Sequence, residues 1–171
     1  MTEYVFDIEA DGIDATKIHC MIANGEEVNR FFFKNLTSDD VLIGHNIIRY
    51  DIKVLEELLG IKIKAQLIDT LALSWYLFPT INRHGLEQWG ERLNIEKPTI
   101  TDWENLTREE YIHRCKEDVK INTKLWGLQK SLLIKIYDGD YQPLVRYLSF
   151  KMKMAMLQEA SKWKLDVDKA N

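Results

Sequence analysis

Short apolar segments separated by polar turns dominate the first 70 residues of the chain, and their lengths are those of β-strands. Five such segments are predicted as strands: residues 3–8, 17–23, 27–33, 41–44 and 65–68. Asn24-Gly25 lies between the second and third segments, and this dipeptide is typical of a tight hairpin. The pattern therefore predicts that the first three strands pair antiparallel.

Apolar residues at three- and four-residue spacing predict helices over the rest of the chain. The predicted helices are residues 51–59, 71–77, 83–93, a long helix that begins after Thr107, and 143–160. Gly60 is a plausible stop for the first of them, and Thr107 with Glu110 forms a capping-box pattern. Residues 97–103 are predicted as a loop, and 163–168 as the start of a new element. Helices that alternate with strands indicate an α/β domain with a mixed sheet.

Length and charge limit the function classes. A chain of 171 residues is long enough for one domain with a substantial core. Its net charge of −4 argues against a broad basic surface for duplex DNA. The two cysteines, Cys20 and Cys115, lack the spacing of zinc ligands and are expected to be reduced. No signal peptide and no apolar run long enough for a bilayer is present, so we predict a cytoplasmic location and no membrane partner.

Carboxylates carry the candidate chemistry. Asp7 and Glu9 end the first predicted strand, and side chains two residues apart on a strand project from the same face. Two adjacent carboxylates repel each other, and a divalent cation of the Mg²⁺ class is the usual reason to place them together. The alternative is an ordinary strand end. Asp51 begins a predicted helix, so it is a candidate ligand, a candidate N-cap, or both.

These acids belong to an ordered set of motifs. The set consists of Asp7-Ile8-Glu9-Ala10, Asn46-x-x-x-Tyr50-Asp51, Ile68-Asp69-Thr70-Leu71, residues 84–90 (HGLEQWG) and Asp118-Val119-Lys120-Ile121-Asn122-Thr123. Over roughly residues 3 to 130 the set resembles the DEDD-type 3′–5′ exonucleases. The likeness is greatest to the proofreading domain of bacteriophage family A DNA polymerases.

The third motif departs from that family. The phage and bacterial polymerases place a Tyr four residues before the last acid, where this chain has Arg114. The DnaQ-like branch places a His five residues before it, where this chain has His113. Tyr111 lies two helical turns from Asp118, so it cannot substitute without a local distortion.

The resemblance implies a ribonuclease H-like (DnaQ-like exonuclease) fold, an α/β fold with a mixed central β-sheet flanked by α-helices. It also implies two Mg²⁺ ions, replaceable by Mn²⁺, held by Asp7, Glu9, Asp51 and Asp118. His113 would orient or deprotonate the attacking water, and Arg114 is the alternative contact, to the scissile phosphate. The residues expected to contact substrate are Ala10, Asn46, Tyr50 and Arg114.

The implied function is metal-dependent 3′–5′ hydrolysis at the 3′ end of single-stranded or frayed DNA, as in proofreading during phage DNA replication in the host cytoplasm. Residues 1–137 would form the exonuclease domain. Residues 138–171 resemble the helical junction to a polymerase domain of the same polypeptide, so we expect a fragment, with a free-standing exonuclease as the alternative. Two further alternatives are an RNase D-like exoribonuclease and a catalytically inactive structural or binding domain of a polymerase.

Other residues are expected to be structural. The apolar helical positions Trp75, Tyr76, Trp89 and Trp126 are predicted to pack in the core. An aromatic that stacks on terminal bases would suit single-strand recognition, but the sequence does not single one out. We expect His45 and His84 to hydrogen-bond within their own turns, and Asp69 to cap a helix.

Overall fold

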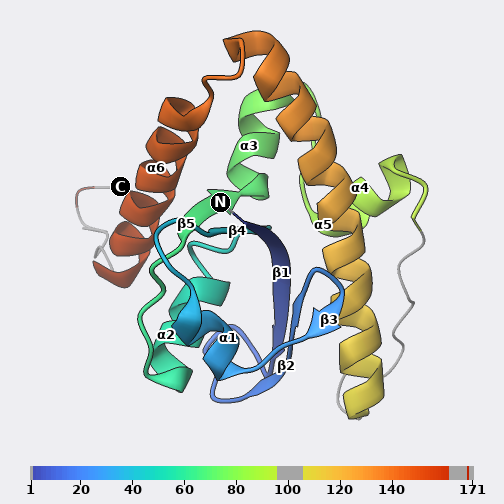
Figure 1. The fold of residues 1–171 in the computed structure, drawn as a ribbon, viewed down its shortest axis with the longest axis vertical. Helices are drawn as coiled ribbons and strands as arrows, with labels where there is room; N and C mark the ends of the chain where they lie inside the picture. The colour runs from blue at the N-terminus through green and yellow to red at the C-terminus, as the bar shows by residue number, and fades with distance from the viewer. Residues whose placement is uncertain (1, 96–105, 162–168, 170–171) are drawn as a thin grey trace.

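A five-stranded mixed sheet forms the centre of the computed structural model, which describes residues 2–95, 106–161 and 169 (Figure 1). The spatial order of the strands is β3-β2-β1-β4-β5. Their bounds are β1 (Glu3–Ala10), β2 (Ile18–Ala23), β3 (Glu26–Glu27), β4 (Val41–Gly44) and β5 (Gln66–Asp69). β1 pairs antiparallel with β2 and parallel with β4, and β4 pairs parallel with β5. The predicted mixed sheet flanked by helices is confirmed.

Helices cover both faces of this sheet (Figure 1). The helices are α1 (Arg30–Asn35), α2 (Asp51–Leu59), α3 (Thr70–Leu77), α4 (Leu86–Arg92), α5 (Arg108–Tyr137) and α6 (Gln142–Ser161). α1 and α2 pack on the face that carries Phe6 and Ile8. α3, α5 and the first turn of α6 pack on the face that carries Val5. Alternate residues of β1 therefore belong to two separate cores, as the period of a strand requires.

Part of the third predicted strand is wrong. β3 ends at Glu27, and helix α1 takes up most of the aromatic run that suggested a strand. Asn29 caps this helix, since its side-chain oxygen accepts a hydrogen bond from the backbone N–H of Phe31 at 2.9 Å. Phe33 is fully buried and packs edge-on against Phe6. Burial of this ring and the cap together outweigh the strand preference of the aromatic run.

The remaining predicted elements lie close to the observed ones. The turn at Asn24-Gly25 is formed by two residues with positive φ, 49° and 86°. α2 spans the predicted residues, and Gly60 ends it in the left-handed conformation with φ 61°. Both hydrogen bonds of the capping box at Thr107 are present. α4 begins three residues later than predicted. The predicted loop at 97–103 and element at 163–168 lie outside the described residues.

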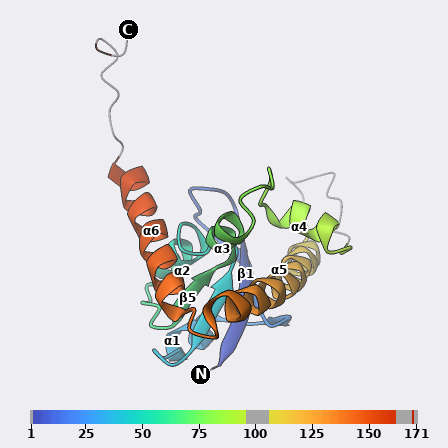
Figure 2. The ribbon, with the colours of Figure 1, turned by 90° about the horizontal axis from the view of Figure 1, so that it is seen from above.

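α6 reverses the direction of the chain after α5. α5 ends at Tyr137, and the reversal uses positive φ at its C-cap Asp138 (49°) and at Gly139 (87°). Val145 in the first turns of α6 is buried, whereas the second half of the helix extends away from the sheet (Figure 2). The predicted domain boundary coincides with this reversal, and the domain assignment itself stays a prediction. Across the described ranges, no helix combines the length and apolar character that a membrane span needs.

Candidate active site

Strand β1 places two carboxylates on the face of the sheet that α5 covers. Phe6 and Ile8 point into the core under α1 and α2, so Asp7 and Glu9 must point to the opposite face. The register with β2 shifts between Glu9 and Ala10, which is a bulge at the end of the strand. Both acids are partly buried and lie near the C-terminal end of β1.

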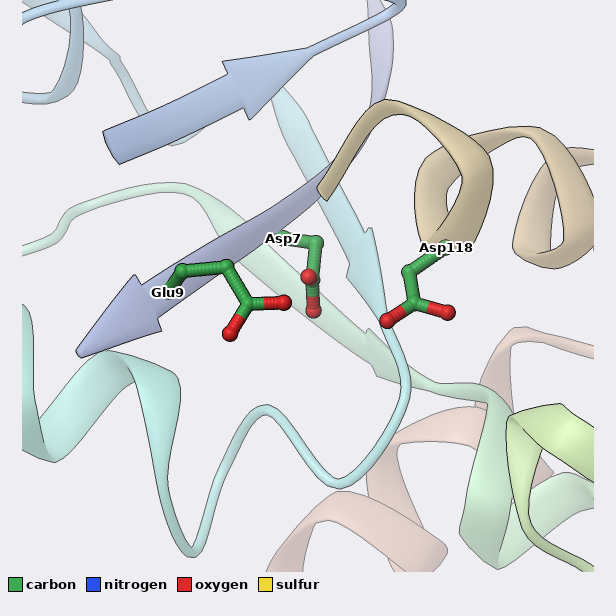
Figure 3. Close-up of side chains that lie close together, drawn as sticks. All are labelled: Asp7, Glu9 and Asp118. Carbon is green, nitrogen blue, oxygen red and sulfur yellow. The ribbon is translucent and has the colours of Figure 1, made fainter. Parts of the chain in front are cut away.

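Helix α5 brings a third acid to the same place. Asp118 is 5% exposed and faces β1 from the middle of the long helix. In Figure 3 the side chains of Asp7, Glu9 and Asp118 point toward one another. One oxygen of each carboxylate lies within 4.8 Å of the other two. More than a hundred residues of sequence separate Asp118 from Asp7, so only the fold creates this cluster.

Asp51 approaches the cluster from the loop between β4 and α2. It is the first residue of α2 and is 3% exposed. Tyr50 occupies the N-cap position, so the interpretation of Asp51 as the cap is wrong. The backbone N–H of Ile8, which lies between Asp7 and Glu9 in β1, is close enough to the Asp51 carboxylate to oppose the rise in its pKa. The fourth acid therefore lies directly against the strand that carries the first two.

Burial and repulsion between charges raise the proton affinity of two of these acids, Asp7 and Asp51. Burial, followed by the charges of Asp51, Asp118 and Glu9, raises the pKa of Asp7 well above its usual value. Burial is also the largest cause that raises the pKa of Asp51, to about 8, with smaller contributions from Asp69 and Glu9. Hard oxygen donors that repel one another at such short range are a donor set that fits a divalent cation.

Two groups on α5 partly balance these charges. The Arg114 Nε donates to Glu9 Oε1 at 2.7 Å, and both side chains are less than one-fifth exposed. The Cys115 thiol donates to Asp7 Oδ2 at 3.4 Å. A hydrogen bond with Cys20, followed by burial, raises the pKa of this thiol, so it keeps its proton. Both cysteines are free, as predicted, and the sequence did not indicate the contact of Cys115 with an acid.

His113 and Arg114 occupy different faces of α5. Arg114 precedes Asp118 by four residues, so the two share a face. His113 precedes Asp118 by five residues, which is roughly 140° away around the helix axis. The His113 side chain is exposed, and within the described ranges its side chain makes no hydrogen bond or ion pair to the four acids. The structure thus brings Arg114, and not His113, against the carboxylates.

The loop between β4 and α2 is fixed from β5. The Asp69 carboxylate accepts from the backbone N–H groups of Asn46 at 3.1 Å and Ile48 at 3.4 Å. It also accepts from Leu71 at 3.0 Å and Ala72 at 3.3 Å, so its predicted role as the cap of α3 is confirmed. One buried carboxylate therefore joins the start of α3 to the loop that carries Asp51.

The other residues predicted to contact substrate lie around the acids. Ala10 is the last residue of β1, directly after the bulge. Asn46 adopts the left-handed conformation with φ 65°, which a non-glycine residue rarely adopts. The Tyr50 hydroxyl donates to the carbonyl oxygen of Gly12 at 2.7 Å and so links the loop to the residues after β1.

Comparisons with known proteins identify the fold. A scan of protein-family models gives no match, and a search of curated proteins gives none. Solved structures of NrnC from Brucella melitensis do match: NrnC with bound Mg²⁺ is 16% identical with a TM-score of 0.67, over 96% of this chain and 89% of that chain. NrnC bound to pGG is 17% identical with a TM-score of 0.68, and a chain described as the apo form of a nuclease is 18% identical with a TM-score of 0.67, at the same coverage.

The chain has a ribonuclease H-like fold of the DnaQ type. The fold class predicted from the sequence is therefore confirmed. At this level of identity the likeness concerns the fold, and the roles of individual side chains rest on the geometry above.

A buried polar network behind the acids was missed by the sequence analysis. Thr70 Oγ1 donates to Asn122 Oδ1 at 2.7 Å and lies 3.0 Å from His45 Nδ1. His45 thus bonds to the first residue of α3, outside the turn in which its hydrogen bond was predicted. His84 does bond within its turn, to the Ile81 carbonyl at 3.1 Å. The one available signal was the position of Asn122, one helical turn after Asp118 on the same face.

The four aromatic residues predicted in the core divide into two pairs. Trp89 and Trp126 are buried, with 4% exposure each, as predicted. Trp75 is 65% exposed and Tyr76 is 45% exposed, so the prediction is wrong for both. α3 is apolar over nearly its whole circumference, and periodicity therefore could not identify its outer face.

Proposed function

We propose that this chain is a divalent-metal-dependent 3′–5′ exonuclease that removes nucleotides from the 3′ end of single-stranded or frayed DNA. The observation that carries the proposal is the convergence of Asp7, Glu9 and Asp118 within 4.8 Å, with Asp51 against the same strand. The fold adds support, since NrnC has been solved with bound Mg²⁺ and with pGG. The ordered motifs of the sequence support it independently.

The four acids are the proposed metal-binding residues. Asp7 is central, since it is affected by the charges of the other three. The donor set consists of carboxylate oxygens, which suit two Mg²⁺ ions, with Mn²⁺ as a substitute because it favours the same ligands. When bound, such ions lower the pKa of the attacking water and stabilise the charge on the departing 3′-oxygen.

The protein's own groups would orient the acids and the scissile phosphate. The Cys115 thiol holds one oxygen of Asp7, and Asp51 lies next to the Ile8 amide of β1. Arg114 lies beside Glu9 at the edge of the acids, and a guanidinium at this place suits a contact with a phosphate oxygen. His113 remains the residue that the motif resemblance assigns to the attacking water.

A proofreading role within a phage family A DNA polymerase is the biological context that the sequence motifs favour. In this context residues 138–171 would connect the nuclease to a polymerase domain of the same polypeptide. A second candidate is hydrolysis of RNA in the manner of RNase D. The likeness to NrnC bound to pGG supports short oligonucleotides as substrates in either case.

Shortening of end-labelled oligonucleotides tests the proposal. Matched single-stranded DNA and RNA are labelled at the 5′ end and incubated with Mg²⁺ or with EDTA. We expect a ladder of products that lose nucleotides from the 3′ end, only with Mg²⁺, and faster on DNA. Faster degradation of RNA would select the exoribonuclease.

Variants assign the activity to the site. Asp118→Asn should abolish release of nucleotides, whereas Glu117→Gln is the matched control, since Glu117 pairs with Lys120 at 3.2 Å on the same helix. No metal-dependent release from either nucleic acid, or full activity of Asp118→Asn, would overturn the proposal.

A further inference from the structure

A depression of about 360 Å³ lies between the β4–α2 loop, α3 and α6. Arg49 lines it from the loop, Trp75 and Tyr76 from α3, and Lys151 and Met152 from α6. The other lining residues are apolar, so every charged side chain of the lining is a cation. We call this depression the aromatic groove.

The two aromatic rings of the groove are exposed yet held in place. Large aromatic side chains usually bury most of their surface, but more than half of Trp75 is open to solvent. The centroids of the Trp75 and His84 rings lie 5.3 Å apart. The His84 ring is held in turn by a hydrogen bond between its Nδ1 and the Ser74 hydroxyl, at 2.7 Å. The hydroxyl of Tyr76 is hydrogen-bonded to the hydroxyl of Tyr137. Fixed, exposed rings are suited to stacking against a flat partner.

The cations around the rings indicate an anionic partner. α3 carries no charged residue, and α6 carries three cations, Arg146, Lys151 and Lys153, against the single acid Glu159. Glu159 pairs with Arg49. Arg146 and Lys153 line a different depression, so the groove itself presents two cations, Arg49 and Lys151, and no acid in its lining.

The groove is continuous with the acidic site along the chain. Arg49 lies in the loop that leads into α2, two residues before the buried Asp51, which is the first residue of that helix. Asp69 fixes this loop and also caps α3, which carries the two exposed rings. The positions of the acid and of the rings are thereby coupled through one short stretch of structure.

We propose that the aromatic groove binds the single-stranded nucleic acid upstream of its 3′-terminal nucleotide. Bases stack on Trp75 and Tyr76, and phosphates contact Lys151 and Arg49, which exchanges its ion pair with Glu159 for a phosphate. Stacking and cationic contacts read neither sequence nor sugar, so DNA and RNA strands both fit. The inference rests on the proposed function in one respect, because the acids must hold the 3′ end.

Binding measured without hydrolysis tests the groove. A fluorescently labelled nine-nucleotide thymidine strand is titrated with the full chain in EDTA, alongside the same strand with abasic sites at the second to fourth positions from its 3′ end. Loss of the bases should weaken binding by the wild-type chain about 5- to 150-fold for each stacked base. Trp75→Ala should weaken binding of the intact strand by a similar factor and remove most of the difference between the two strands.

Three further variants separate stacking from charge. Phe150→Ala is the matched control, because Phe150 is 56% exposed on α6 but lines a different depression. Its affinity should equal that of the wild type. Glu159→Gln should tighten binding, since it releases Arg49. The logarithm of the binding constant falls linearly with the logarithm of the salt concentration, and Lys151→Ala should make this slope less steep by about 0.7.

The outcomes distinguish the groove from the catalytic proposal. Wild-type affinity in Trp75→Ala, with an intact circular dichroism spectrum, would overturn the groove even if the chain hydrolyses DNA with Mg²⁺. Loss of self-association in Trp75→Ala, without any affinity for the strand, would identify a second copy as the occupant and would also overturn it. Trp75-dependent binding without hydrolysis would retain the groove and refute the exonuclease.

Discussion

At the scale of single residues, Asp7 is the point at which the charges of the site meet. Burial raises its pKa most, and the charges of Asp51, Asp118 and Glu9 raise it further. The Cys115 thiol is the hydrogen-bond donor to its Oδ2. An ionised carboxylate so placed is destabilising in the metal-free protein, and a bound divalent cation would offset this cost.

Replacement of Asp7 should separate activity from stability. Asp7→Ala should abolish nucleotide release at saturating Mg²⁺, because the central carboxylate is gone. The free energy of unfolding without metal should hold or rise at pH 8, since one of several repelling acids is removed. Single-turnover kinetics and urea denaturation measure the two effects. Substantial residual hydrolysis would exclude a central role for this carboxylate.

We expect different effects from substitution of Arg114 and of His113. Because Arg114 contacts Glu9 and His113 is exposed on another face, we expect Arg114→Ala to weaken binding of a single strand and to reduce its salt dependence. His113→Ala should change the chemical step little. Single-turnover rates and affinities check both variants, with Lys116→Ala as the control for loss of an exposed cation on α5. A fall of roughly 10²–10⁴-fold in the chemical step of His113→Ala would instead support a general base.

At the scale of elements, the short stretch between β4 and α2 positions the site. One residue, Asp69, accepts hydrogen bonds from this loop and from the first turn of α3. Its pKa is raised by burial, although the backbone N–H groups around it oppose the shift. Asp51 and Arg49 both depend on this loop for their positions.

Removal of the Asp69 carboxylate should therefore affect both stability and activity. Asp69→Ala leaves the N–H groups of Asn46 and Leu71 without their acceptor. We expect a loss of about 1–3 kcal/mol in the free energy of unfolding, and a fall in activity from displacement of Asp51. Asp69→Asn keeps one acceptor oxygen, so it should cause smaller losses of stability and of activity. Urea denaturation and nucleotide release measure them, and an unstable but fully active Asp69→Ala would show that the loop keeps its position without this residue.

At the scale of the whole molecule, the raised pKa values of Asp7 and Asp51 couple folding to pH. The pKa of Asp51 is raised to about 8 from 3.8, and that of Asp7 is also raised. Between pH 3.8 and about pH 8 the folded state therefore binds more protons than the unfolded state. The stability of the metal-free protein falls as the pH rises through this range. Asp11 acts in the opposite direction, because a hydrogen bond from Thr16 lowers its pKa to about 2.

Denaturation at several pH values tests this coupling. With EDTA, we expect the free energy of unfolding to decrease from pH 5 to pH 8, at up to about 1.4 kcal/mol per pH unit for each proton released. Mg²⁺ should flatten this decrease, since it stabilises the ionised carboxylates of the folded state. Asp51→Asn should reduce the slope without metal. A flat profile in EDTA would show that the acids ionise as freely in the folded state as in the unfolded chain.

The sequence by itself determined those features that depend on neighbours along the chain. Asp7 and Glu9 share a face because a strand has a period of two, and the box at Thr107 and Glu110 requires residues three apart. The end of α2 is also a local feature, because the left-handed φ of Gly60 terminates the helix. The ordered acids indicated the fold through their resemblance to the motifs of a known family, and each motif is a short local stretch of sequence.

Tertiary structure decided the features that depend on contacts between distant segments. The aromatic run before Leu36 became a helix because Phe33 is buried against β1, a contact that no local period contains. Trp75 is exposed because other elements cover the opposite side of α3. Arg114 rather than His113 meets Glu9 because the packing of α5 on the sheet sets which face of the helix turns to β1. Helical and strand periods give the spacing of side chains, and only the packing of the elements decides which of them meet.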